Sequence, residues 1–127
     1  FSSNKVVPLG QFDSGLDGQS AELTGTGDAR LFGFFTTTPI RVAEINKSNG
    51  KIASNKALAQ VQTPQAWAFS FWGGDFYLYT SPDGTSDSTV TRYRPSDDSV
   101  DTSYMTNIGF TIVGAGVSTC APTEIPK

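Results

Sequence analysis

The sequence predicts an all-β protein made of antiparallel four-stranded repeats, and three observations lead to this fold class. A pattern of short apolar runs that begins at Ala21 returns at Ala66, about 45 positions later, which is the length of a four-stranded repeat. The 13 Gly and 7 Pro residues interrupt the chain at short intervals, as they do between short strands. No stretch of about a dozen residues sustains the 3.6-residue period of an amphipathic helix. We expect one domain over residues 1–127, with repeats at about 21–58 and 66–108.

The first repeat is expected to hold four strands joined by short turns. Its second strand follows the Gly27-Asp28 pair and carries aromatic rings at alternate positions, so that the large side chains gather on one face. The third strand ends in the turn from Asn46 to Gly50, whose Asn-Gly pair supplies the left-handed backbone that a tight hairpin needs. Ile52 resumes the apolar pattern in the fourth strand. The expected strands begin, in order, near residues 21, 31, 42 and 52.

The second repeat follows the same order with two differences. Its second strand again follows a Gly-Asp pair and alternates its rings, and its third strand ends in the turn from Arg94 to Asp98. That turn lacks the closing Gly of the first copy and favours a type I turn. The loop at 81–88 is longer than its counterpart. The expected strands begin, in order, near residues 66, 76, 90 and 100.

This arrangement resembles the blades of extracellular bacterial β-propellers over roughly residues 21–108. The turn from Asn46 to Gly50 is similar to the D-x-x-T-G turn of such repeats. The resemblance implies two blade-like units that form part of a propeller, a fragment of one, or an assembly of copies. A β-sandwich or barrel is the alternative for the same strands. The propeller family has no single activity to carry over.

The two ends of the chain raise a question of blade count. Residues 5–9 are expected to form an outer strand and residues 110–113 an innermost strand, which gives two full and two partial blades. A closed propeller needs at least four blades. The sequence leaves the oligomeric state open, and also whether the chain is a fragment of a longer propeller. A short helix within 46–62, where Lys, Ala, Leu and Gln gather, is the structural alternative.

Charge and hydropathy exclude several partners. The net charge is -3, and the nine Lys and Arg residues are scattered, so we expect no nucleic-acid partner, which would need a basic patch. No run approaches eighteen apolar residues, so we expect no membrane span. A low Lys content with many Ser, Thr, Gly and aromatic residues is typical of secreted β proteins. We therefore expect an extracellular, cell-surface or periplasmic location.

The sequence offers no constellation of catalytic residues, and we predict that the chain is not an enzyme. It has no histidine, which removes Ser-His-Asp and Cys-His catalysis and the commonest zinc ligand. Cys120 stands alone, so it is a free thiol or bridges to another chain. Most of the acidic residues lie beside Gly, Ser or Pro, which is typical of turns.

Two oxygen-rich loops are the weak candidates for a metal. Asp13 and Asp17 lie in the first, and Asp83 and Asp87 lie in the second. Calcium takes carboxylate and carbonyl oxygens, but neither loop carries the full ligand spacing of a calcium loop. We expect no cofactor, with calcium in either loop as the alternative to a plain connection between strands.

The hairpin at 67–79 is the richest aromatic segment of the chain. Rings on both faces of its second strand favour a place between stacked sheets, where most of them would be core residues. The alternative is a ring-stacking platform for sugars, with hydrogen bonds from polar neighbours. Its ligand-binding residues would be Trp72, Asp75, Tyr77, Tyr79 and Arg92.

These observations predict a non-enzymatic, exported β-repeat module for protein interaction or structural assembly. Its partner would be another protein or a second copy of the chain. A lectin-like carbohydrate-binding protein that uses the hairpin at 67–79 is the alternative. A hydrolase that acts through two carboxylates ranks last, because no acid has the apolar surroundings that raise the pKa of a general acid. The identity of the ligand or partner is left open.

Overall fold

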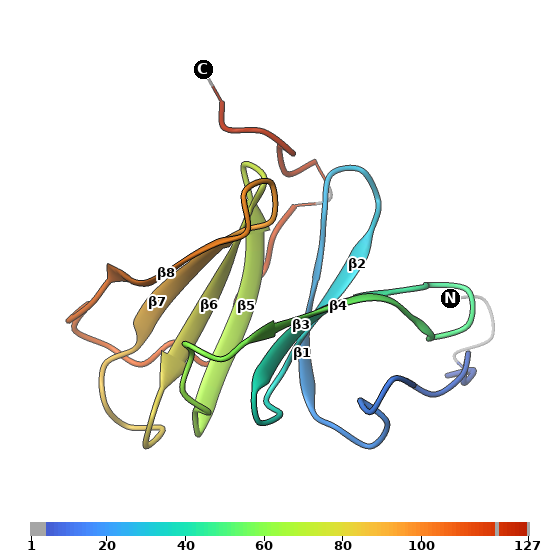
Figure 1. The fold of residues 1–127 in the computed structure, drawn as a ribbon, viewed down its shortest axis with the longest axis horizontal. Helices are drawn as coiled ribbons and strands as arrows, with labels where there is room; N and C mark the ends of the chain where they lie inside the picture. Colours follow the sequence, from blue (N-terminus) through green and yellow to red (C-terminus); the bar gives the residue numbers. More distant parts are fainter. Residues whose placement is uncertain (1–4, 119, 127) are drawn as a thin grey trace.

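The computed structural model describes residues 5–118 and 120–126 and contains two four-stranded antiparallel sheets, with no helix in those residues. In the first sheet, neighbouring strands are consecutive in the chain. Figure 1 shows this sheet in blue to green beside the second sheet in green to orange. The strands of the first sheet are β1 (Ala21–Gly25), β2 (Leu31–Phe35), β3 (Ile40–Ile45) and β4 (Ile52–Leu58).

The second sheet repeats this up-and-down order. Its strands are β5 (Ala66–Trp72), β6 (Asp75–Ser81), β7 (Thr89–Arg94) and β8 (Ser99–Met105). Neither sheet closes into a barrel. The predicted all-β class with antiparallel four-stranded units is therefore confirmed. The outermost residues of the predicted domain, 1–4 and 127, lie outside the described residues.

The two sheets bury their aromatic residues against each other. On β5, Phe69 and Phe71 point toward the first sheet, because side chains alternate between the two faces of a strand. Phe34 of β2 meets Phe69 with ring centroids 5.9 Å apart. Burial of each such ring stabilises the fold by roughly 1.5–3 kcal/mol. The buried residues of this core are Phe32, Phe34, Ile40, Val42, Leu58, Val61, Phe69, Phe71, Phe76, Leu78, Tyr93 and Ala121.

The turns explain how two different sequences close equivalent hairpins. Gly50 closes the turn after β3 with a φ of 73°, in the left-handed region that favours glycine. Asp98 stands at the equivalent place after β7 and adopts a φ of 60°. Aspartate enters this region more readily than most residues because its short polar side chain bonds locally. The missing Gly of the second repeat is thus replaced by Asp98.

The face of the first sheet that points away from the second is covered by the chain itself. Leu16 of the N-terminal segment is fully buried and packs with Phe35, Ala43 and Ile45. The Oδ1 atom of Asp13 accepts a hydrogen bond of 2.9 Å from the backbone N–H of Ile52, which attaches the segment to β4. The centre of the first sheet, at β2 and β3, is therefore buried on both faces.

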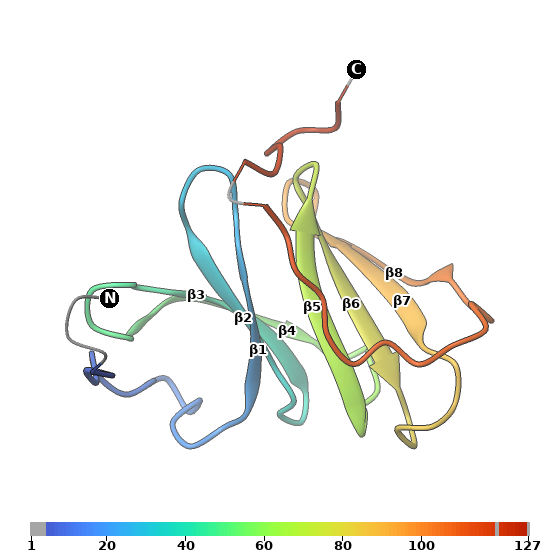
Figure 2. The same ribbon diagram turned by 180° about the vertical axis from the view of Figure 1, so that it is seen from behind.

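The C-terminal segment crosses the hairpin tips of both sheets. Figure 2 shows it returning beside β5 after β8. The N–H of Gly73 donates to the Pro122 carbonyl oxygen over 2.9 Å. A Cβ atom at Gly27 would lie 2.0 Å from the Ala121 carbonyl oxygen, so glycine is needed for the close approach. The segment thus ties the tip of the first sheet to the tip of the second.

Two expectations about secondary structure are wrong. Residues 5–9 are exposed coil without a neighbouring strand, and residues 110–113 are also coil. The latter are held by Ser88, whose N–H donates to the Phe110 carbonyl oxygen and whose Oγ accepts from the Ile112 N–H. A strand needs a ladder of backbone bonds to a neighbour, which these two bonds do not make. The helix considered within 46–62 is replaced by a turn and β4. The described residues therefore do not form the two partial blades that the sequence predicted.

Candidate functional site

The outer face of the second sheet, meaning the face that points away from the first sheet, collects the predicted ligand-binding residues. It is formed by every second residue of β5, β6 and β7, since successive side chains point to opposite faces, and by residues of β8. Its ring-bearing and charged members are Trp72, Asp75, Tyr77, Tyr79, Arg92, Arg94, Asp101 and Tyr104.

Strand pairing arranges these side chains in two rows across the sheet. Trp72 lies directly opposite Asp75 at the hairpin tip. In the next row, Tyr77 lies opposite Arg92, and Arg92 lies opposite Asp101. Residues paired in this way have Cβ atoms about 5 Å apart, close enough for their side chains to interact. The face is consequently a rigid strip carried by strands rather than by loops.

The rings of the strip are in contact with one another and with a cation. The ring centroids of Tyr77 and Tyr104 are 5.7 Å apart. The guanidinium carbon of Arg92 lies 4.6 Å from the Tyr104 centroid, a cation–π contact. Tyr79 and Ser70 share a hydrogen bond of 2.9 Å between their hydroxyl oxygens. Burial raises the pKa of the Tyr77 phenol, so this hydroxyl keeps its proton at neutral pH.

The charges of the strip are paired. Arg94 donates two hydrogen bonds of 3.0 Å to the carboxylate of Asp75, a bidentate pair. The Asp75 side chain is only 4% exposed. Arg92 lies 3.9 Å from Asp75 and 4.0 Å from Asp101 between nitrogen and oxygen atoms. Two cations and two carboxylates therefore leave the strip without net charge.

Solvent reaches part of the strip. Trp72 is 49% exposed and Tyr104 is 40% exposed, whereas Tyr77 and Arg92 are half-buried. The sequence prediction missed Arg94 and Tyr104. Arg94 could have been predicted, because it lies two residues after Arg92 and therefore on the same face of the strand. Tyr104 could not, because the pairing of β7 with β8 shifts between Val90 and Arg92 and interrupts the two-residue period.

The acidic loops that were candidates for calcium use their carboxylates within the chain. Asp83 accepts hydrogen bonds from the Ser86 hydroxyl and from the backbone N–H groups of Ser86 and Thr85, which hold its pKa well below the usual range. Asp87 accepts from the Gly109 N–H over 2.9 Å. Asp17 is exposed in the N-terminal turn. Within residues 5–118 and 120–126, no three His, Cys, Asp or Glu side chains gather as a metal would require.

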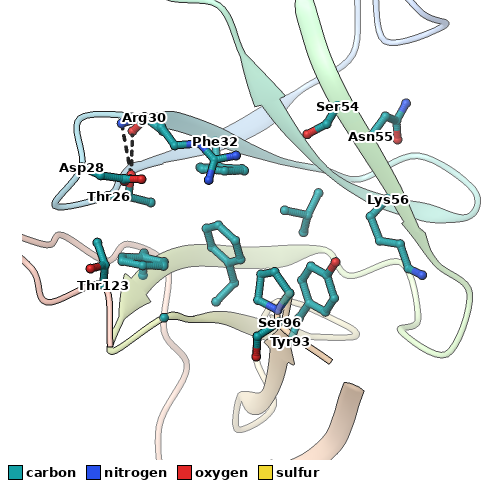
Figure 3. Close-up of a pocket in the computed structure, with 15 residues that line it drawn as sticks. Thr26, Asp28, Arg30, Phe32, Ser54, Asn55, Lys56, Tyr93, Ser96 and Thr123 are labelled. Atoms are coloured by element: carbon teal, nitrogen blue, oxygen red, sulfur yellow. Dashed lines mark hydrogen bonds between the residues drawn. The ribbon is translucent and has the colours of Figure 1, made fainter. Parts of the chain in front are cut away.

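A cleft between the two sheets is a second candidate site, and sequence reasoning did not find it. Figure 3 shows polar side chains of the first sheet facing the aromatic wall of the second. The cleft has a volume of about 420 Å³. Its walls come from both sheets, so no single segment of the sequence signals it. Its aromatic members include Phe32, Phe71, Phe76 and Tyr93.

Three further findings bear on the predictions. Cys120 is exposed and forms no disulfide with the described residues. The described part of the chain has no helix of the length and hydropathy that a membrane crossing requires. Comparison with protein-family models, curated proteins and solved structures gives no match for this chain.

Proposed function

We propose that this chain is a non-enzymatic, exported β-repeat module that assembles with another protein through the outer face of its second sheet. The observation that carries the proposal is the strip of rings and paired charges on that face. Aromatic and Arg side chains are enriched in protein interfaces. The sheets themselves are blade-like units in this proposal, and a stacked partner would occupy the position of the next blade.

The charge pattern favours a second copy of the chain as the partner. The strip carries Arg92 and Arg94 together with Asp75 and Asp101. Two identical faces related by a twofold axis would each supply both signs of charge, so that they complement each other. The corresponding face of the first sheet offers less open surface for this role, because Leu16 and its neighbours cover it at β2 and β3.

The carboxylates support a non-enzymatic role. A general acid needs a pKa raised toward neutrality. Instead, hydrogen bonds from Arg30 lower the pKa of Glu44, and hydrogen bonds from Ser99 lower that of Asp97. These groups therefore remain ionised in the range where a general acid would have to hold a proton.

The native mass of the purified chain tests the proposal. Light scattering over rising concentration should show a shift from the 13.5 kDa monomer toward a dimer. Arg92→Glu should weaken that association roughly a hundredfold, since a lost interface charge pair costs about 2–5 kcal/mol. Arg41→Glu on the first sheet is the matched control and should associate like the parent. A parent that stays monomeric throughout, or an Arg92→Glu variant that dimerises equally well, would overturn the proposal.

A lectin-like function is the second candidate, and the exposure of Trp72 favours it. An exposed indole beside the Tyr77–Tyr104 pair offers flat apolar area that can stack on a sugar ring. A glycan array should then show saturable binding that disappears in Trp72→Ala. Phe110→Ala, which removes a 60% exposed ring elsewhere, should bind unchanged. Loss of binding in both variants, or in neither, would reject this site.

A further inference from the structure

The cleft between the sheets has two unlike walls. The wall from the first sheet carries the polar side chains of Asp28, Arg30, Ser54 and Lys56 around Phe32 and Val42. The lining residues of the second sheet and its turns are uncharged and include Phe71, Phe76, Tyr93 and Pro95. A molecule in this cleft would meet apolar rings from both sheets and hydrogen-bonding groups that come mainly from the first.

The aromatic wall is a fixed cluster of rings. Phe76 lies at its centre, with its ring centroid 4.7 Å from Phe32, 5.2 Å from Phe71 and 6.2 Å from Tyr93. Each of these four side chains is at most 7% exposed, so its packing in the core holds it in place. A ligand therefore meets a rigid apolar surface that needs no rearrangement to bind.

The cations at the rim are already compensated. Arg30 donates two hydrogen bonds to Glu44, of 3.0 and 2.6 Å. Lys56 of β4 forms an ion pair with Asp98 of the turn after β7, the one ion pair between the two sheets among the described residues. With Asp28 counted, the rim has no surplus of positive charge. It is consequently not built for an anionic ligand such as a phosphate.

Further hydrogen-bonding groups surround the same opening. The carboxylate of Asp28 accepts from the Thr26 hydroxyl and has lone pairs for further donors. Ser54 and Ser96 add hydroxyl groups to the lining (Figure 3). These groups suit a ligand that carries several hydroxyls, because each hydroxyl both donates and accepts.

We propose that this cleft binds a neutral mono- or disaccharide. A sugar ring has one face of C–H groups and a rim of hydroxyls, which matches the aromatic wall and the polar wall respectively. The volume of about 420 Å³ lies at the small end of ligand sites, which span about 300–1,000 Å³. The site is separate from the outer face of the second sheet and does not depend on the assembly proposed above.

The Lys56–Asp98 pair lies beside the aromatic wall. The Tyr93 hydroxyl donates to Asp98 over 3.3 Å, and burial raises the pKa of that phenol, so it stays a hydrogen-bond donor at neutral pH. A sugar hydroxyl can enter this network without leaving an unpaired charge. Replacement of Lys56 would open the rim and leave Asp98 without its cation.

An NMR titration of the whole chain tests the site. D-glucose, N-acetylglucosamine and maltose are the saccharide probes, and phenol is the aromatic probe without a hydroxyl-rich rim. At least one saccharide should shift the backbone amides of Ser54, Asn55 and Ser96 in a saturable manner. Ser54→Ala and Asp28→Ala should each weaken that binding about tenfold, the effect of one lost hydrogen bond.

Trp72→Ala is the control, because it alters the outer face of the second sheet and should leave cleft binding unchanged. Two lining variants are used so that one remains informative if the other fails to fold. Saccharide shifts confined to Trp72 and Tyr104 would overturn the cleft proposal in favour of the outer face. No saccharide shift, or a shift of the cleft amides with phenol alone, would also overturn it.

Discussion

The two sheets present different outer faces although they repeat the same four-stranded order. On the first sheet, Phe35 and Ala43 are at most 1% exposed because the N-terminal segment lies over them. On the second, Trp72 is 49% exposed and Tyr104 is 40% exposed. The centre of the first outer face is therefore covered by its own chain, whereas the second outer face exposes two of its rings to solvent.

The chemistry of each face fits its surroundings. An apolar face such as that of Phe35 and Ile45 costs free energy when left in water, so it needs a permanent cover. The second face combines rings with the paired charges of Asp75 and Arg94, which are compatible with exposure to water. The comparison shows one outer face whose centre belongs to the folded core, and one whose exposed rings our proposal assigns to a partner.

Truncation of Leu16, which packs over the first sheet, should have the largest effect on the free energy of unfolding. Leu16→Ala deletes a fully buried side chain and should lower the free energy of unfolding by about 2–5 kcal/mol. Leu23→Ala, at a position 49% exposed on the same sheet, is the control and should change it little. Urea unfolding measures both variants. Equal losses would mean that the N-terminal segment does not cover the first sheet.

Displacement of the C-terminal segment, which joins the tips of the two sheets, should have the next largest effect on stability. Gly27→Ala places a Cβ against the Ala121 carbonyl oxygen, and the segment must shift, at a cost of about 1–3 kcal/mol. Gly116→Ala lies in the same segment with open space around it, so it is the matched control. Thermal unfolding of the pair decides the matter. A Gly27→Ala variant as stable as Gly116→Ala would show that the C-terminal segment does not hold the two sheets together.

The equivalent turns of the two sheets should respond more weakly. Gly50→Ala forces a left-handed residue to carry a Cβ and should cost about 1–2 kcal/mol. Gly50→Asp copies Asp98 of the second sheet and should cost less, because aspartate tolerates this backbone. Differential scanning calorimetry compares the two. If Asp proves no better than Ala at this position, the turns are not equivalent.

Low pH should have the smallest effect on stability, because it acts through exposed ion pairs. Hydrogen bonds from Arg30 lower the pKa of Glu44, and those from Lys56 lower that of Asp98. A carboxyl whose pKa is lower in the folded state stabilises the fold above its ordinary pKa of about 4, and this stability is lost as the pH falls through the lowered value. The melting temperature should therefore drop below about pH 4, and less steeply in Glu44→Gln. An identical slope in both proteins would contradict this.

Sequence patterns predicted the parts of the fold that depend on local periodicity. The alternating rings near residues 31 and 76 predicted two strands, which the structure has as β2 and β6. It could not predict that residues 110–113 remain coil, because a strand depends on a neighbour with a free edge. The cleft was also beyond reach, since Asp28 and Tyr93 come together only when two sheets stack.

Footprinting with hydroxyl radicals tests the central claim that the outer face of the second sheet is the binding face. The readouts are the oxidation rates of Trp72 and Tyr104, with Leu23 on the first sheet as the internal reference. As the concentration rises and the chain assembles, Trp72 and Tyr104 should become protected while Leu23 reacts as before. Unchanged oxidation of Trp72 and Tyr104 in an assembled sample would contradict the account.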